Sequence, residues 1–199
     1  MLTRMLFIGS LLVLGCADDK GTTPPAEVGF VVSGTLSNDN QTQLPENLKV
    51  VVIWTAATET GEDYIYLFGE GAVDAENMTF EIVFAENPPS DALLADALGV
   101  GFILLTTDSD IEEGIVSEDD LFQNALGAAG QHGVVFTTDK LDSLSLEEVG
   151  WLQQFPRGYG VGRGVKIPNS SFDGFEPVDP SSVEIIVDDM DDIEFVNWT

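Results

Sequence analysis

Carboxylates at alternate positions are the side chains of this chain best suited to bind a metal ion. They are Asp108, Asp110 and Glu112, followed by Asp119. Calcium takes about six to eight oxygen ligands from a flexible loop, and this acidic segment supplies such oxygens. The spacing departs from that of an EF-hand, because Glu113 stands where the glycine belongs and Asp119 where the final glutamate belongs. Calcium is thus the one cofactor that the sequence suggests, and a solvated acidic loop is the alternative that the abundance of carboxylates favours.

A second candidate site combines cations with one aromatic ring. Arg157, Tyr159, Arg163 and Lys166 lie in or beside a stretch in which glycine occupies every second position from 158 to 164. Alternate residues of a strand face opposite sides, so we expect the glycines to leave one face bare and the other face to present Arg157, Tyr159 and Arg163. This binding patch could dock an acidic group of a protein or glycan partner. The alternative is that its cations pair with carboxylates of the same protein.

The bare glycine face has a structural consequence of its own. Without side chains, it allows an aromatic ring or another backbone to approach closely. Trp54, Trp151 or Phe155 could fill this space. The spacing is not that of a dinucleotide-binding loop, and no strand–helix context supports one.

Catalytic motifs are missing from the sequence. It contains no G-x-S-x-G, no phosphate-binding glycine–lysine loop and no H-E-x-x-H. His132 is the only histidine, and its neighbours Gly130 and Gly133 predict a turn. A zinc site with two histidines is therefore excluded, and we expect no enzymatic activity. A hydrolase that uses a pair of carboxylates is the less favoured alternative, because such a pair has no sequence signature among 35 acidic residues.

The first residues have the features of an export signal. Arg4 precedes a short apolar run from 5 to 14, which is about half the roughly 20 residues that a membrane-spanning helix needs. The run ends in Val13-Leu14-Gly15-Cys16. One interpretation of this ending is a conventional cleaved signal peptide in which Cys16 has no role.

This ending resembles the lipobox of bacterial lipoproteins. The resemblance implies that residues 1–15 are a signal peptide and that Cys16 is acylated and becomes the first residue of the mature protein. It also implies a bacterial cell envelope, in which the acylated cysteine holds the protein in the lipid bilayer. Ala17, rather than aspartate, follows the cysteine, which by the enterobacterial rule implies the outer membrane. We expect residues 16–27 to form the lipidated cysteine and a polar tether.

The composition limits the remaining partners. The chain has 35 acidic and 7 basic residues and a net charge of −28. Nucleic acids and anionic membrane surfaces require clustered Lys and Arg, so neither is expected to bind. A hydrophobic content of 44% predicts a folded domain rather than a disordered chain. With a single cysteine, that domain depends on core packing without an internal disulfide.

Periodicity predicts which elements must position these residues. Alternating or continuous apolar runs predict strands, and residues 48–57 are apolar enough for a central strand covered on both faces. Short helices are expected at 92–98, 121–129 and 145–154. The expected strands lie at 28–36, 48–57, 63–69, 78–84, 100–107, 133–138, 159–167, 183–187 and 193–198.

Many short strands joined by turns are typical of a β-sandwich or a barrel. We expect one mainly β domain over 28–199, an antiparallel β-sandwich of immunoglobulin or transthyretin type with a few short helices. An α+β fold with an antiparallel sheet is the alternative. The predicted function is a non-enzymatic binding or structural module exposed outside the cytoplasm, with a calcium-dependent adhesion module as the alternative.

Overall fold

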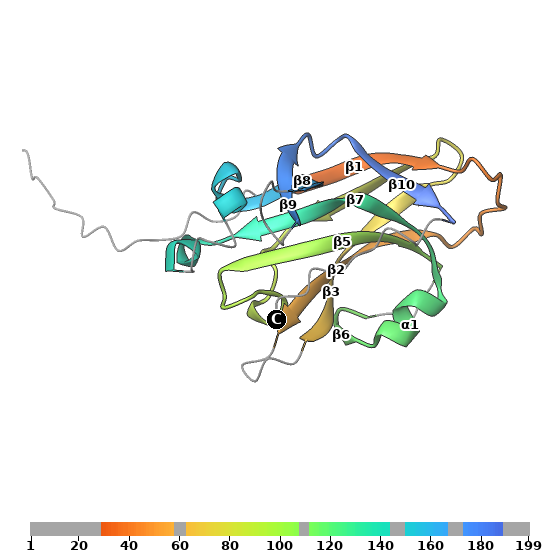
Figure 1. The fold of residues 1–199 in the computed structure, drawn as a ribbon. Coiled ribbons are helices and arrows are strands. Elements are labelled where there is room, and N and C mark those ends of the chain that lie inside the picture. The colour runs from red at the N-terminus through yellow and green to blue at the C-terminus, as the bar shows by residue number, and fades with distance from the viewer. Residues whose placement is uncertain (1–28, 58–62, 108–111, 144–149, 167–172, 189–199) are drawn as a thin grey trace, which may run out of the picture.

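A computed structural model describes residues 29–57, 63–107, 112–143, 150–166 and 173–188 of the chain (Figure 1). These residues form strands, one short α-helix and three 3₁₀ segments. The helical elements are η1 (Ser90–Ala92), α1 (Glu118–Gln123), η2 (Asp139–Ser143) and η3 (Gly150–Gln154). The strands are β1 (Phe30–Ser37), β2 (Lys49–Ala57), β3 (Asp63–Asp74), β4 (Thr79–Phe84), β5 (Leu98–Thr106), β6 (Gly114–Val116), β7 (Ala125–Thr137), β8 (Gly158–Lys166), β9 (Asp173–Val178) and β10 (Val183–Val187).

Seven of the strands close into a mixed β-barrel. The order around it is β10, β1, β4, β3, β2, β5 and β7, and β7 pairs again with β10. The β1–β10 pair is parallel and the other pairs in the barrel are antiparallel. The expected antiparallel sandwich is therefore wrong, because β10 joins the two edges that a sandwich would leave free. The α+β alternative is also wrong, since the described chain contains one short α-helix, whereas its mainly β character is confirmed.

Closure depends on close backbone approach at both sides of β10. A Cβ atom on Gly34 would overlap the carbonyl oxygen of Val183, and one on Gly127 would overlap that of Ile186. Glycine at these two positions lets β1 and β7 approach β10 from either side.

Two further strands extend the sheet outside the barrel. One edge of β7 pairs with β10 at Gly127 and Ala128, and with β8 from His132 to Thr137. β9 then pairs with β8. Between the two partners β7 bulges: Phe102 pairs with Gly133 and Leu104 with Ala128, so residues 129–132 lie opposite Ile103 alone. The separate strand β6 pairs with the first part of β3.

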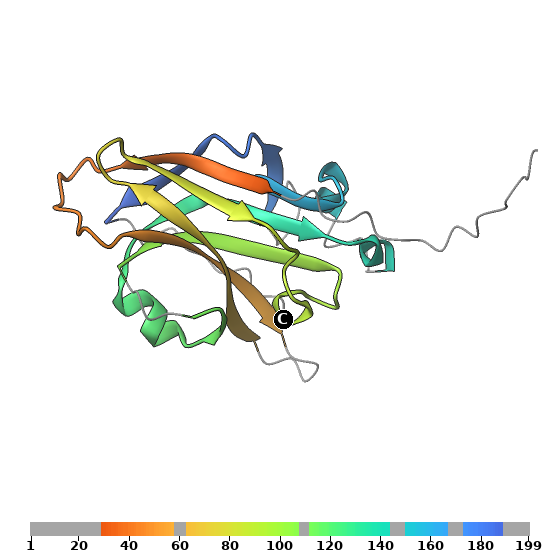
Figure 2. The same cartoon turned by 180° about the vertical axis from the view of Figure 1, so that it is seen from behind.

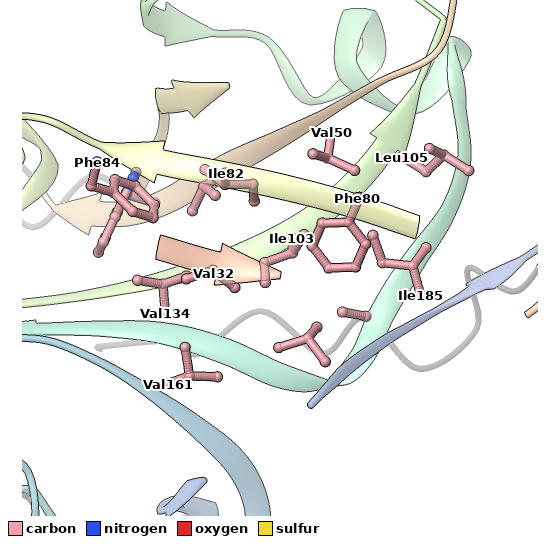
Figure 3. Close-up of a cluster of buried hydrophobic side chains, with 14 of the residues drawn as sticks. Val32, Val50, Phe80, Ile82, Phe84, Ile103, Leu105, Val134, Val161 and Ile185 are labelled. Atoms are coloured by element: carbon pink, nitrogen blue, oxygen red, sulfur yellow. The ribbon is translucent and has the colours of Figure 1, made fainter. Parts of the chain in front are cut away.

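Apolar side chains fill the barrel interior (Figure 3). Alternate residues of the barrel strands face inward, as the period of two predicts. Full burial stabilises the fold by roughly 1.5–3 kcal/mol for each large aliphatic side chain. The following interior residues are each at most 1% exposed: Val32, Val50, Val52, Ile82, Ile103, Leu105, Val134 and Ile185.

A second apolar cluster covers the outside of β2, β5 and β7. There Leu121 of α1, Leu141 of η2, Leu152 of η3 and Phe155, which follows η3, pack against the outward residues of the barrel strands. Residues 50–55 of β2 and all of β5 are consequently buried on both faces. The prediction of a central strand covered on both sides at 48–57 is confirmed for residues 50–55.

The expected helices are mostly shorter than predicted. α1 ends at Gln123, with Asn124 as its C-cap, and residues 125–129 belong to β7 instead, because small residues there pair with β5 and β10. Only η1 forms near 92–98 and only η3 within 145–154, of which 145–149 lie outside the described residues. The strand expected at 193–198 also lies outside them, as do the predicted signal peptide and tether.

Candidate functional site

A shallow hollow lies on the outer face of β1, β4 and β3. Three residues from each strand line it, 33–35, 79–81 and 72–74, together with Ser181 from the β9–β10 turn. The hollow has a volume of about 590 Å³ and is open to solvent. In the sheet register Glu81 lies between Ser33 and Ala72, so its carboxylate belongs to the middle strand of the hollow.

The alternation of β4 aims polar groups into this hollow. Phe80, Ile82 and Phe84 are buried in the barrel, so Thr79, Glu81 and Val83 face outward. In the next row of the register, Thr79 lies between Thr35 and Asp74. The surface of the hollow therefore carries hydroxyl and carboxylate groups.

The β3–β4 turn at the end of the hollow is held by Asp74. Its carboxylate accepts hydrogen bonds from Nδ2 of Asn77 at 2.7 Å and from the backbone N–H groups of Asn77 and Glu76 at 3.0 and 3.1 Å. These bonds, led by the side chain of Asn77, lower the pKa of Asp74. Asp74 is thus ionised and committed to the turn.

The β9–β10 turn is held in a similar way beside β1. Asp179 accepts hydrogen bonds from the backbone and hydroxyl of Ser181, which lower the pKa of its carboxyl group. The carbonyl of Pro180 accepts a 2.9 Å hydrogen bond from the N–H of Ser33. These bonds fix Ser181 at the rim of the hollow.

An apolar pair continues the same outward face. Val31 of β1 and Val83 of β4 are register partners, and they are 37% and 50% exposed. The hollow and this pair have no nucleophile paired with a base among their residues. The chemistry that they offer is hydrogen bonding, one central negative charge and apolar contact.

The structure does not gather the predicted cationic patch on one surface. Tyr159 is buried: its hydroxyl donates a 2.6 Å hydrogen bond to the carbonyl of Glu86, and burial raises the pKa of Tyr159 well above its usual value. Its ring stacks on those of Phe84 and Phe30, with centroids 4.6 and 5.3 Å away. Tyr159 faces the apolar core because β8, rather than β10, is the neighbour of β7 over residues 132–137.

Both arginines of the predicted patch have acidic neighbours. Arg163 pairs with Glu176 of β9, and Nε of Arg157 lies 4.0 Å from Oδ1 of Asp139. Lys166 ends β8. Ion pairing within the protein, the alternative considered above, accounts for the two arginines, and recognition of an acidic ligand by these residues stays a prediction.

Aromatic rings do fill the bare face of the glycine strand. Phe155 lies 2.9 Å from the position that a Cβ atom of Gly160 would occupy, and Phe155 and Phe175 both crowd that of Gly162. Of the three alternative rings, Phe155 is the one found there, whereas Trp54 lies in the barrel interior. Trp151 packs beside Phe155 and Phe175.

His132 lies in the bulge of β7 rather than in a turn. It is half-buried and is the register partner of Arg163. Burial, followed by the positive charge of Arg163, lowers the pKa of His132, and Glu184 of β10 opposes this shift. His132 is thus the first residue of β7 that pairs with β8, after the segment of β7 that pairs with β10.

The calcium site is only partly within the described chain. Glu112 and Asp119 are exposed, whereas Asp108 and Asp110 lie outside the described residues, as does Cys16. Within the ranges that the structure describes, no three His, Cys, Asp or Glu side chains lie close enough to hold a metal. Calcium binding stays a prediction, and the midpoint of thermal unfolding in calcium against chelator tests it, with Asp108→Ala and Asp110→Ala as controls.

Comparison with known proteins assigned no relative: no family model, curated protein or solved structure matched the chain. In the part of the chain that is described, no helix has the length and hydrophobicity to cross a membrane.

Sequence reasoning missed the hollow. Its residues come from three separate strands and meet only through the register of β1, β4 and β3. The available signal was the alternation of residues 79–84, which predicted an outward polar face without showing what lay beside it.

Proposed function

We propose that this chain is a lipoprotein of the bacterial outer membrane, held in the bilayer by acylated Cys16, and that its barrel domain binds a partner without catalysing a reaction. The lipobox-like Val13-Leu14-Gly15-Cys16 supports the anchor. Several acyl chains, at about 0.8 kcal/mol for each buried CH₂ group, hold a protein stably in a bilayer.

The packed interior of the barrel is the observation that supports binding through the outer surface. Barrels that carry small ligands keep a cavity between their strands. Here Val50, Ile82, Ile103 and Val134 meet inside the barrel and are at most 1% exposed (Figure 3). A ligand would have to displace this core, so recognition falls to the loops and the outward faces of the strands.

Lipid labelling tests the anchor. The full chain, expressed in an enterobacterial host with a clickable palmitate analogue, should carry the label and sediment with the outer membrane. Cys16→Ser should lose the label, and Ala17→Asp should keep the label but move to the inner membrane. An unlabelled wild-type chain, or a labelled Cys16→Ser chain, would refute the lipoprotein proposal.

A further inference from the structure

One outer face of the barrel is not covered by any other element of the described residues. α1, η2 and η3 pack over β2, β5 and β7, where they bury the second apolar cluster. Figure 2 shows β1, β4 and β3 on the near side, with no helix of the described chain in front of them. The face includes the hollow of about 590 Å³ and the exposed pair Val31 and Val83.

The β1 and β4 strands of this face carry little charge for so acidic a chain. Among their outward residues, Glu81 alone is charged; the others are Val31, Ser33, Thr35, Ser37, Thr79 and Val83. The exposed carboxylates of β3 beside them already have partners: Glu70 pairs with Lys49 of β2, and Asp74 holds the β3–β4 turn. Depletion of charge is the compositional mark of the centre of a protein–protein interface. Short and β-branched side chains also lose little rotamer entropy when a partner covers them, which lowers the cost of binding.

Electrostatics decides which partner fits. Glu81 lies in the middle strand of the hollow and Asp74 at its end, and none of the residues that line the hollow is basic. A second copy of the chain would bring another net charge of −28 against this face, which disfavours self-association. An anionic partner is disfavoured for the same reason.

We propose that the outer face of β1, β4 and β3 docks a cationic segment of a partner protein, with a Lys or Arg at Glu81 and an apolar side chain against Val31 and Val83. This inference rests on the proposed binding function and names its surface and partner class. The open shape of the hollow suits a protruding side chain on another protein, because a small ligand needs deeper enclosure.

Selection of peptides tests the docking surface. Phage-displayed random peptides are panned on the soluble domain starting at Ala17, at about 0.15 M salt, which screens the general attraction of cations to an acidic protein. We expect enriched peptides in which Lys or Arg is flanked by apolar residues. Their affinity should fall about tenfold or more for Glu81→Lys.

Matched variants separate this surface from the rest of the acidic protein. Glu113→Lys makes the same charge change at an exposed residue outside the hollow, and Ile115→Ser matches Val83→Ser at an exposed apolar residue of β6. Binding should survive Glu113→Lys and Ile115→Ser and weaken for Glu81→Lys and Val83→Ser. Glu81→Gln, which keeps the side-chain size, provides the same test if Glu81→Lys fails to fold.

Three results would overturn the docking proposal: no peptide enriched above the bare matrix, enriched peptides without Lys or Arg, or equal losses in the matched variants. None of them bears on lipid labelling at Cys16. Failure of this inference is therefore distinguishable from failure of the anchor proposal.

Discussion

At the scale of single residues, Tyr159 joins the β8–β9 extension to the barrel. Its ring packs against Phe30 of β1, Phe84 of β4 and Phe136 of β7, and its hydroxyl is bonded to the carbonyl of Glu86. The buried ring and the hydrogen bond contribute to stability separately, so two substitutions distinguish them.

We expect Tyr159→Phe to lower the free energy of unfolding by about 1 kcal/mol, because it removes one hydrogen bond and keeps the ring. Tyr159→Ala should cost roughly 3–5 kcal/mol, because it leaves a cavity among the aromatic rings. Urea denaturation followed by tryptophan fluorescence measures both. Equal effects of the two variants would contradict the packing role of the ring.

His132 predicts a pH dependence of stability. Its pKa in the folded protein is lowered by burial and by Arg163, with Glu184 acting in the opposite direction, whereas an unfolded histidine has a pKa of about 6.5. The unfolded chain therefore binds the proton more readily, and stability falls as the pH falls below about 6.5 towards the folded pKa. Because His132 is the only histidine, His132→Gln should flatten this slope in urea titrations between about pH 5.5 and 7.5. An unchanged slope in the variant would show that other groups cause it.

At the scale of elements, closure is decided where β10 meets β1 and β7. The order of the strands along the chain is compatible with a sandwich. What makes the fold a barrel is the parallel pair of β1 with β10 and the short antiparallel pair of β10 with β7. Glycine at positions 34 and 127 makes both contacts sterically possible.

Gly34→Ala should separate β1 from β10, because the added methyl group would overlap the backbone of Val183. We expect a loss of unfolding free energy of at least roughly 1–3 kcal/mol, the usual cost of overpacking. Gly150→Ala is the control, since nothing lies within 4 Å of the added atom, and it should be nearly neutral. Hydrogen exchange of the β10 amides would locate the loss; protection equal to wild type would count against this account of closure.

At the scale of the whole molecule, the net charge of −28 is the dominant electrostatic feature. Repulsion among like charges destabilises a compact state, and salt screens exposed charges with a Debye length of about 10 Å at 0.1 M. The ion pairs seen in the described chain are partly exposed and contribute little to stability, so their screening by salt costs little stability.

We expect the midpoint of thermal unfolding to rise by several degrees between low salt and about 0.5 M sodium chloride, as the Debye length shrinks below the spacing of surface charges. Differential scanning calorimetry at fixed pH measures the shift. Potassium chloride should reproduce it at equal ionic strength, since screening does not depend on the identity of the cation. A midpoint that falls with salt would mean that ion pairs outweigh repulsion.

Local pattern by itself determined where most strands lie and that the strand within residues 48–57 is covered on both faces, as found for 50–55, because alternation and continuous apolar runs report which faces are buried. It also supplied the lipobox-like ending on which the anchor proposal depends. The tertiary structure decided the barrel, since the β1–β10 pairing joins Gly34 to Val183 across most of the chain and leaves no local signal. The tertiary structure also decided that Tyr159 is buried in the core and that β1, β4 and β3 together line the hollow. Register and closure arise from contacts between strands that are distant in the sequence.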